Sequence, residues 1–245
     1  MKIICIMQAR MGSSRLKGKV LKTICDQTVL EHDIDRLKKS KNISDIIVAT
    51  TTKEEDDVIV KMSQKKKVKF YRGSEDNVLE RYYFAAKDSN ADVIVRVTSD
   101  CPCMDYNVID NVIDLFIQNS SVVDYVSNTL ERTFPRGYDV EVFSYRALEK
   151  AYNFASKNYE KEHVTPYIYD VKNKFNLMQY KYIKDYSQYR VTLDTKEDLE
   201  VINRIFNSLY YENKYFTLED VVKVLSEDDE LVKINKFVEQ KKLGE

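Results

Sequence analysis

The sequence predicts an α/β fold built on a mostly parallel sheet, and three observations carry this prediction. Short runs of apolar, β-branched residues alternate with amphipathic segments throughout the first half of the chain. The 245 residues are 43% hydrophobic, which suffices for one full core. We find no internal repeat, low-complexity stretch or linker in the sequence. Alternating strands and helices imply parallel strands joined by right-handed crossovers.

The first half supplies the clearest elements. Four apolar runs are expected to form strands: 2–8, 45–51, 68–71 and 92–97. Three segments are expected to form helices: 28–40, 54–65 and 76–89. In the first of these helices, Leu30, Ile34 and Leu37 recur at helical spacing. Ligands of such sheets bind where strands end, so the polar loops 8–19 and 98–105 are the places to expect a site.

The second half has weaker patterns. Helices are expected at 107–118, 145–156, 160–171, 195–208 and 217–225, and the charged tail from 229 is a candidate for a last helix. Strands are expected at 123–127, 139–143, 175–183 and 189–193. We expect a single domain over 1–245, with a possible inserted arm at about 130–185.

Composition excludes several classes of protein. A net charge of −1 argues against a nucleic-acid binder, which needs a basic surplus. No apolar run approaches the roughly 20 residues of a membrane span, and no signal peptide is evident. Of the four cysteines, Cys101 and Cys103 stand too close for an ordinary zinc knuckle. We therefore expect reduced, mostly buried thiols in a cytoplasmic protein that binds neither nucleic acid nor membrane.

The loop after the first strand has the composition of a phosphate site. It carries three cations, Arg10, Arg15 and Lys19, together with glycines and serines that let backbone and hydroxyl donors approach an anion. The loop lacks G-x-G-x-x-G, and its spacing before Gly18-Lys19 does not fit a P-loop, so both standard phosphate loops are disfavoured. A solvated basic loop is the alternative.

Several segments resemble the cytidylyltransferases. QARMGSSRLKGKVL at 8–21 is similar to the signature of CMP-Kdo and CMP-sialate synthetases and most similar to that of SpsF-type spore-coat polysaccharide proteins. Similar segments follow in order: VATTTKEEDD (48–57), FYRGSEDNVLERYY (70–83), ADVIVRVTSDCP (91–102), DYVSNTLERTFPRGYDVEVF (124–143), EHVTPYI (162–168) and RVTLDTKEDLEVI (190–202). The resemblance implies a Rossmann-like sheet of the nucleotide-diphospho-sugar transferase type, with a small dimerisation arm and a homodimeric assembly.

The resemblance also implies an activity. It implies that CMP moves from CTP to a small anionic acceptor, an acidic sugar or another oxyanion, with Mg²⁺ as cofactor and release of pyrophosphate, in cell-surface polysaccharide biosynthesis. Two alternatives stay open, a nucleotidyltransferase that uses another NTP and a non-catalytic nucleotide-binding protein.

The resemblance assigns roles to residues of this chain. The catalytic residues it implies are Arg10, Arg15, Lys19 and Asp100. The nucleotide-binding residues are Gln8, Ala9, Arg10, Gly12, Ser13, Ser14, Arg15, Lys19, Arg72, Thr98 and Ser99. The acceptor-binding residues are Asn128, Asp139, Glu141, His163 and Arg190. For Arg72 a surface position, and for His163 a structural role, are the alternatives.

Two aspartates are the metal ligands that the resemblance implies. Asp100 lies in T-S-D-C-P and Asp194 in L-D-T-K-E-D-L, and each follows a predicted strand. Carboxylates at two strand ends can converge, and Mg²⁺ prefers a few carboxylates together with phosphate oxygens. The alternative for Asp194 is helix capping, and the alternative for Asp100 is a turn before Pro102. Ser99 stands where relatives usually have glycine.

Overall fold

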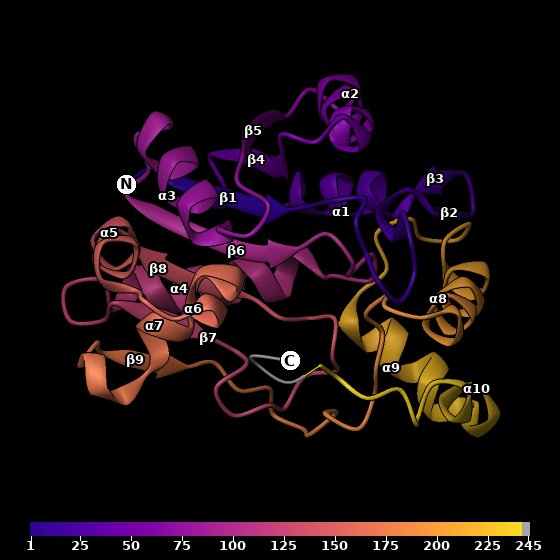
Figure 1. The fold of residues 1–245 in the computed structure, drawn as a ribbon. Helices are drawn as coiled ribbons and strands as arrows, with labels where there is room; N and C mark the ends of the chain where they lie inside the picture. Colours follow the sequence, from indigo (N-terminus) through magenta and orange to yellow (C-terminus); the bar gives the residue numbers. More distant parts are fainter. Residues whose placement is uncertain (242–245) are drawn as a thin grey trace.

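A seven-stranded sheet in the order β5-β4-β1-β6-β8-β7-β9 forms the centre of the fold (Figure 1). The computed structural model describes residues 1–241. The strands of the sheet are β1 (Ile3–Gln8), β4 (Asp45–Thr51), β5 (Lys69–Gly73), β6 (Val93–Thr98), β7 (Tyr125–Ser127), β8 (Glu141–Ser144) and β9 (Leu177–Gln179). A separate small hairpin pairs β2 (Thr23–Ile24) with β3 (Gln27–Thr28).

The sheet is mostly parallel, as the alternation of elements predicts. β1 pairs in parallel with β4 and β6, and β4 pairs in parallel with β5. β8 runs antiparallel to both β6 and β7, and β9 is parallel to β7. β1 carries apolar side chains on both of its faces, as expected of a strand in a sheet that helices cover on both sides.

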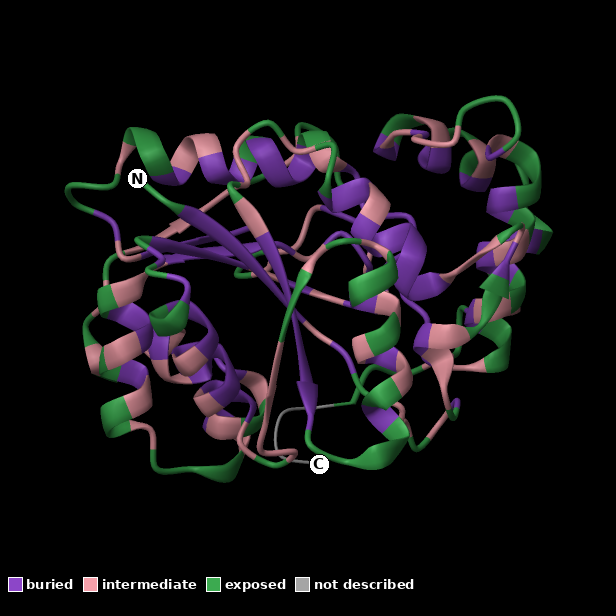
Figure 2. Ribbon diagram, turned by 90° about the horizontal axis from the view of Figure 1, so that it is seen from above, coloured by how far each residue is buried: buried purple, intermediate pink, exposed green. Residues whose placement is uncertain are grey.

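Side chains of β1 alternate between two hydrophobic layers. Ile3, Cys5 and Met7 pack in one layer, and Ile4 and Ile6 pack in the other. The first layer is completed by α1 (Val29–Leu37), α2 (Asp57–Lys65), α4 (Tyr106–Gln118), α8 (Lys196–Leu209), α9 (Leu218–Glu227) and α10 (Asp229–Ile234). The second is completed by α3 (Val78–Asp88), α5 (Tyr145–Phe154) and α7 (Pro166–Tyr169). Figure 2 shows buried strands between helices whose outer faces are exposed.

The carboxyl ends of β1 and β6 meet at one edge of the sheet. Gln8, the last residue of β1, is in register with Thr98, the last residue of β6. The loop that follows each strand therefore starts at the same place. This edge is where the two polar loops were expected to form a site.

Two predicted elements differ from the structure. Residues 189–193 form no strand: they make one isolated bridge, from Arg190 to Arg136, although Val191 and Leu193 are buried. Gly137 permits this contact, since a Cβ there would lie 2.8 Å from the Val191 carbonyl. The predicted helix over 160–171 is divided into α6 (Asn158–His163) and α7, because Val164 has φ +72° and cannot continue a helix.

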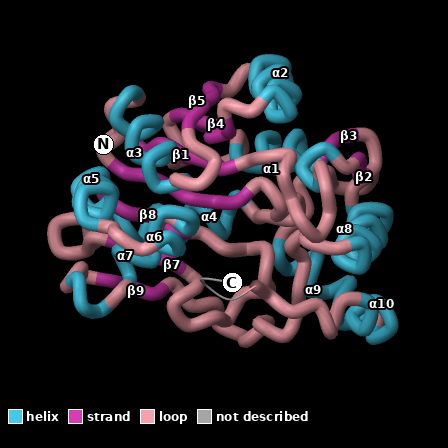
Figure 3. Tube along the Cα trace, in the orientation of Figure 1, coloured by secondary structure: helices cyan, strands magenta, loops and turns pink. Residues whose placement is uncertain are grey.

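Loops occupy much of the region beside the site. Most of residues 128–140 and 180–195 is neither helix nor strand, and these stretches fill the lower middle of the view in Figure 3. The predicted strand over 175–183 is reduced to β9. The stretch expected as an arm, 130–185, supplies β8 and β9 to the sheet and carries α5, α6 and α7. None of the helices within residues 1–241 has the length and hydropathy needed to cross a bilayer.

Candidate active site

The loop after β1 holds its cations in place through a few backbone contacts. The backbone N–H of Met11 donates to the buried Asp56 carboxylate at 2.7 Å. Gly18 adopts the left-handed conformation, φ +64°, and its N–H returns to the Met11 carbonyl at 3.1 Å. A short 3₁₀ helix, Lys19–Leu21, begins at once after that turn. The turn therefore fixes the direction in which Lys19 leaves the loop.

Lys19 joins the two aspartates. Its Nζ lies 2.6 Å from an Asp100 oxygen and 2.8 Å from an Asp194 oxygen. Burial would lower the pKa of Lys19, but the two carboxylates outweigh burial and raise that pKa above its ordinary value. Burial would raise the pKa of Asp100, and Lys19 overcomes this effect and lowers it. One ammonium group thus bridges two carboxylates that are 94 positions apart in the sequence.

Asp194 does not cap the helix that follows it. The N-cap of α8 is Thr195, whose hydroxyl accepts from the Asp198 N–H in a capping box. The Asp194 carboxylate instead receives Arg15 Nη2 at 2.8 Å and Arg190 Nη2 at 2.9 Å, besides Lys19. Its oxygens therefore lie among three cations at the wall of the cleft and not at the start of the helix.

Two adjoining cavities meet at this cluster. The loop cavity, about 480 Å³, is lined by the loop after β1 and the end of β6. Of the residues expected to bind nucleotide, those that line it are Gln8, Ala9, Arg10, Gly12, Ser13, Ser14, Arg15, Lys19, Thr98 and Ser99. The second cavity, about 600 Å³, contains Asp139, Glu141 and His163. Asp100 and Asp194 line both cavities, so the aspartate pair stands at their junction.

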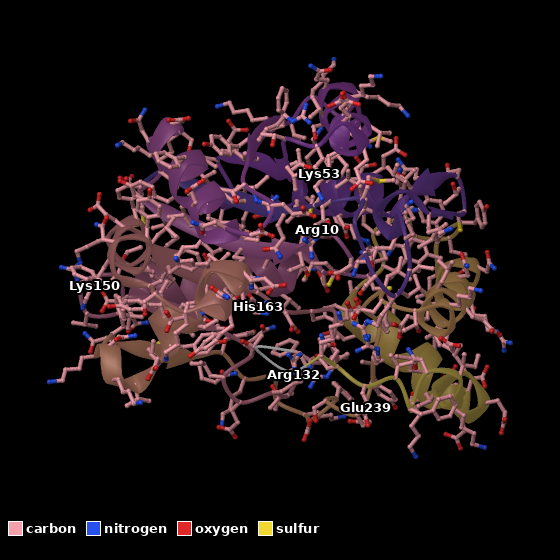
Figure 4. The ribbon with its side chains drawn as sticks, in the orientation of Figure 1. Arg10, Lys53, Arg132, Lys150, His163 and Glu239 are labelled. Atoms are coloured by element: carbon pink, nitrogen blue, oxygen red, sulfur yellow. The ribbon has the colours of Figure 1, made fainter. Side chains whose placement is uncertain are left out.

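The position of the cavities is visible in the side-chain view. In Figure 4, Arg10, His163 and Arg132 lie one below another in the middle of the molecule, whereas Lys150 lies at its edge. Arg10 lines the loop cavity, Arg132 the second cavity, and His163 lines both. The three labelled side chains come from segments more than 30 positions apart.

His163 is presented by a strained turn. Val164 has φ +72° and ψ −56°, and the Thr165 N–H bonds to the His163 carbonyl at 2.8 Å, which defines a γ-turn of the rare positive-φ kind. Burial lowers the pKa of His163, so the imidazole is neutral at pH 7. A β-branched residue in this conformation is costly, and such strain concentrates at functional sites.

Glu141 anchors the second cavity through a buried network. Tyr125 and Thr165 each donate a hydroxyl to its Oε1 at 2.6 Å, and Arg96 forms an ion pair with Oε2. Arg96 also reaches the Gln8 side chain at 3.4 Å. Because Glu141 has these donors, its carboxylate is held in one position at the cavity wall.

Two further arginines of the second cavity were not predicted from the sequence. Arg132 makes a bidentate pair with Asp139, at 2.5 and 2.8 Å. Arg136 lines the same cavity, and burial together with the charge of Arg132 lowers its pKa. Their signal in the sequence is weak: two arginines in an irregular segment around Pro135 and Gly137. The charge of Arg132 is balanced by Asp139, so the net positive charge of this wall comes from Arg136.

Three expected binding residues lie elsewhere. Arg72 lines neither cavity, because its guanidinium is held by the Thr51 and Lys53 carbonyls and by Asp57. Asn128 is buried. Its amide nitrogen donates to the Tyr138 carbonyl and its amide oxygen accepts from the Val140 N–H, so it holds the backbone of this loop in place. These placements correct the expected base contact and one of the expected acceptor contacts.

Arg190 is also displaced from its expected role. It lines neither of the two cavities, and it binds Asp198 with Nε at 2.8 Å and Asp194 with Nη2 at 2.9 Å. Asp198 is fully buried and accepts the backbone N–H groups of Asp194 and Thr195. Arg190 therefore positions Asp194 rather than an acceptor.

The donors present fit Mg²⁺. Within residues 1–241 no group of three or more His, Cys, Asp or Glu side chains is arranged to hold a metal ion by itself. Mg²⁺ commonly takes one or two carboxylates and completes its shell with substrate phosphates and water. Asp100 and Asp194 offer such oxygens around one point, which the Lys19 ammonium now approaches.

Known proteins similar to this chain point to one family. The family model described as Cytidylyltransferase matches residues 4–229. A solved structure of a cytidylyltransferase from Leptospira borgpetersenii is 35% identical, with a TM-score of 0.91 over 99% of each chain. An uncharacterized protein of Methanocaldococcus jannaschii is 41% identical over 100% of this chain and 99% of its own length. The spore coat polysaccharide biosynthesis protein SpsF of Bacillus subtilis is 32% identical over 83% of this chain and 86% of its own.

Proposed function

Because the chain belongs to the cytidylyltransferase family, we propose that it transfers CMP from CTP to an acidic sugar or another oxyanion acceptor, with release of pyrophosphate. We place this reaction in the biosynthesis of a cell-surface polysaccharide. One observation carries the proposal: Lys19 binds Asp100 and Asp194 at the junction of two cavities, one of them lined by the basic loop. A homodimer and a cytoplasmic location stay predictions of the sequence.

The loop cavity suits the triphosphate. Arg10, Arg15 and Lys19 neutralise phosphate charge, and Ser13 and Ser14 add hydroxyl donors. In the reaction an acceptor oxygen forms a bond to the α-phosphorus while the bond from that phosphorus to the bridging oxygen breaks. The leaving pyrophosphate gains negative charge, which the loop cations stabilise. This chemistry depends on positioning and electrostatics rather than on a protein nucleophile.

Asp100 and Asp194 are the proposed ligands of Mg²⁺. When bound, the metal neutralises phosphate charge and lowers the pKa of the acceptor hydroxyl. With the charge of the carboxylates balanced in this way, the Lys19 ammonium is free to contact the phosphates. His163, neutral and placed between the cavities, is available to accept a hydrogen bond from the acceptor.

The second cavity suits an anionic acceptor. Arg136 makes one wall positive, Arg132 beside it is paired with Asp139, and Glu141 with its donors makes another wall polar and rigid. A carboxylate or phosphate of the acceptor is attracted to such a wall, and its hydroxyl can then approach the junction. The fixed positions of these groups favour one orientation of the acceptor over others.

The test has two stages. Thermal unfolding is first measured with CTP, UTP, GTP or ATP in the presence of Mg²⁺, and we expect CTP to raise the midpoint most. Pyrophosphate release is then followed with CTP and a panel of acidic sugars, sugar phosphates and phosphonates. Asp100→Asn should retain the fold and lose pyrophosphate release. A preference for another nucleotide would replace CTP in the proposal, and no stabilisation by any nucleotide would contradict the proposal.

A further inference from the structure

The chain returns to the active site after its last helix. Residues 235–241 follow α10 and run toward the middle of the molecule, where Glu239 is labelled in Figure 4. Asn235 anchors the start of this C-terminal segment: it is buried, and its amide donates to the Arg190 carbonyl at 3.0 Å and to Asp198 at 2.9 Å. The same Asp198 fixes the backbone of Asp194.

Two contacts of the C-terminal segment reach the arginines that hold Asp194. Arg15 donates Nη1 to the Glu239 carbonyl at 3.0 Å while its Nη2 binds Asp194. Arg190 donates Nη1 to the Gln240 side chain at 2.9 Å while its Nη2 binds Asp194. Each guanidinium therefore donates one nitrogen to the C-terminal segment and the other to the Asp194 carboxylate.

The next residue of the segment reaches the basic loop itself. Lys241 Nζ lies 3.2 Å from the Ser14 hydroxyl. Gln240 and Lys241 both line the loop cavity and the second cavity. Ser14 and Lys241 are 227 positions apart, so this contact closes one side of the loop cavity with the far end of the chain.

We propose that the C-terminal segment completes the active site, with Lys241 binding the phosphates of the nucleotide and Gln240 positioning Arg190 against Asp194. The inference rests on the proposed function for the identity of the nucleotide. Arg15 and Lys19 already neutralise aspartates, and Arg10 lies 3.5 Å from Glu75. A triphosphate adds more negative charge to this cavity, and Lys241 brings a further cation to the side of the cavity that Ser14 lines.

The charge of Lys241 is tested by ligand binding. Lys241→Gln is compared with Lys236→Gln, a matched change in the same segment at a residue that lines neither of the two cavities. Affinity is measured by calorimetry with Mg²⁺ for CTP, for inorganic triphosphate and for CMP. We expect Lys241→Gln to weaken the binding of CTP and of inorganic triphosphate roughly tenfold and to change the binding of CMP little. The variant loses a charge-assisted hydrogen bond to the outer phosphates, and CMP has no outer phosphates. Lys236→Gln should bind all three ligands like the wild type.

The role of Gln240 is tested by kinetics. Gln240→Ala should lower kcat while the affinity for CTP changes little, because Arg190 loses an acceptor and Asp194 loses its support. Gln240→Glu retains an acceptor for Arg190 and should recover most of kcat. A merely structural role would instead lower the unfolding midpoint of Gln240→Ala and leave kcat per folded molecule unchanged.

The outcomes separate this inference from the proposed function. If the wild type binds CTP and Lys241→Gln binds triphosphate with unchanged affinity, the role of the C-terminal segment is overturned and the proposed function is not. If the wild type prefers another NTP, the same variants are measured with that nucleotide, and the inference is judged there. Failure of the wild type to bind inorganic triphosphate and every NTP overturns both proposals.

Discussion

The ammonium group of Lys19 bridges both cleft aspartates. Two carboxylates this close repel each other, and Lys19 lowers that repulsion from a position that is only 15% exposed. The arrangement explains why a basic loop and two distant aspartates belong to one site. We propose that a divalent cation bound at this pair takes over the charge that Lys19 balances in the structure.

Replacing Lys19 by Met should make the unliganded protein more responsive to Mg²⁺. The two carboxylates lose their shared cation, so the variant unfolds at a lower temperature, and Mg²⁺ recovers part of the loss. We expect a Mg²⁺-dependent rise of several degrees in the variant, where about 1 kcal/mol corresponds to roughly 2–4 °C, and a smaller rise in the wild type. The measurement is thermal unfolding over a range of MgCl₂ without nucleotide. Lys22→Met is the control, and equal shifts in both variants would argue against a metal at this pair.

Asp33 of α1 provides a test that depends on pH. Its side chain is 3% exposed, and neither carboxyl oxygen has a hydrogen-bond partner among the described residues. Burial, followed by the charge of Asp100, raises the pKa of Asp33 well above its ordinary value. At pH values between the unfolded-state pKa and the folded-state pKa, the folded protein therefore keeps a proton that the unfolded chain releases, and this difference opposes folding.

Asp33→Asn should stabilise the protein at pH 7.5 and have little effect near pH 3. Below the ordinary pKa both states of the wild type carry the proton, so the variant has no advantage there. As pH rises, the wild type alone loses stability until the pH passes its folded-state pKa. Urea unfolding at a series of pH values measures the difference in free energy of unfolding between the two proteins. A difference that does not change with pH would show that Asp33 is ionised in the folded protein.

At the scale of elements, the start of α8 separates structural and ligand-binding roles in neighbouring residues. Thr195 caps the helix with Asp198, and Asp194, one position earlier, points into the cleft. Thr195→Ala should lower the free energy of unfolding by about 1 kcal/mol while leaving the stabilisation by Mg²⁺ and CTP intact. Asp194→Asn should abolish that stabilisation. Urea unfolding and thermal shifts with CTP measure the two effects, and loss of the CTP response in Thr195→Ala would contradict this division.

The sequence predicts the bounds of those helices and strands that have a clear hydrophobic pattern of their own. Strand 45–51 is found with the same bounds, and the apolar run of β1 is found within one residue. Residues 189–193 have the composition of a strand, but their N–H groups bond to separate partners, Arg136 and Asp100. The predicted helix over 160–171 breaks at Val164, which is neither glycine nor proline, so this position gives no local signal for the break. Tertiary contacts decide both cases, and local propensity cannot supply them.

At the scale of the whole molecule, the site joins residues from position 8 to position 241. The loop after β1, Asp100 and Asp194 could be proposed from the sequence, because each follows an apolar run and lies in a segment that resembles the cytidylyltransferases. Lys241 and the arginines at 132 and 136 could not, since they stand in irregular segments without a recurring pattern. Which irregular segments reach the cleft depends on how the C-terminal helices pack on the sheet.

Arg36 connects those C-terminal helices to the rest of the fold. It is 1% exposed on α1, and its guanidinium donates to the carbonyls of Met104, Phe216 and Lys214. It also lies over the Phe216 ring, 4.0 Å from the centroid. The contacts tie α1 to the segment before α4 and to the segment before α9. Because this buried cation contacts both parts, we expect the first half of the chain and the C-terminal helices to unfold together.

Arg36→Met should therefore lower the free energy of unfolding by about 3 kcal/mol or more, because three carbonyls lose a charged donor at once. The loss should appear in a single transition, since sheet and C-terminal helices share this contact. Urea unfolding followed by far-UV and near-UV circular dichroism measures both the size and the cooperativity of the change. Arg204→Met, on the exposed face of α8, should change stability by less than about 0.5 kcal/mol. If Arg36→Met instead gave an early transition confined to part of the signal, the C-terminal helices would be a separate unit that folds without α1.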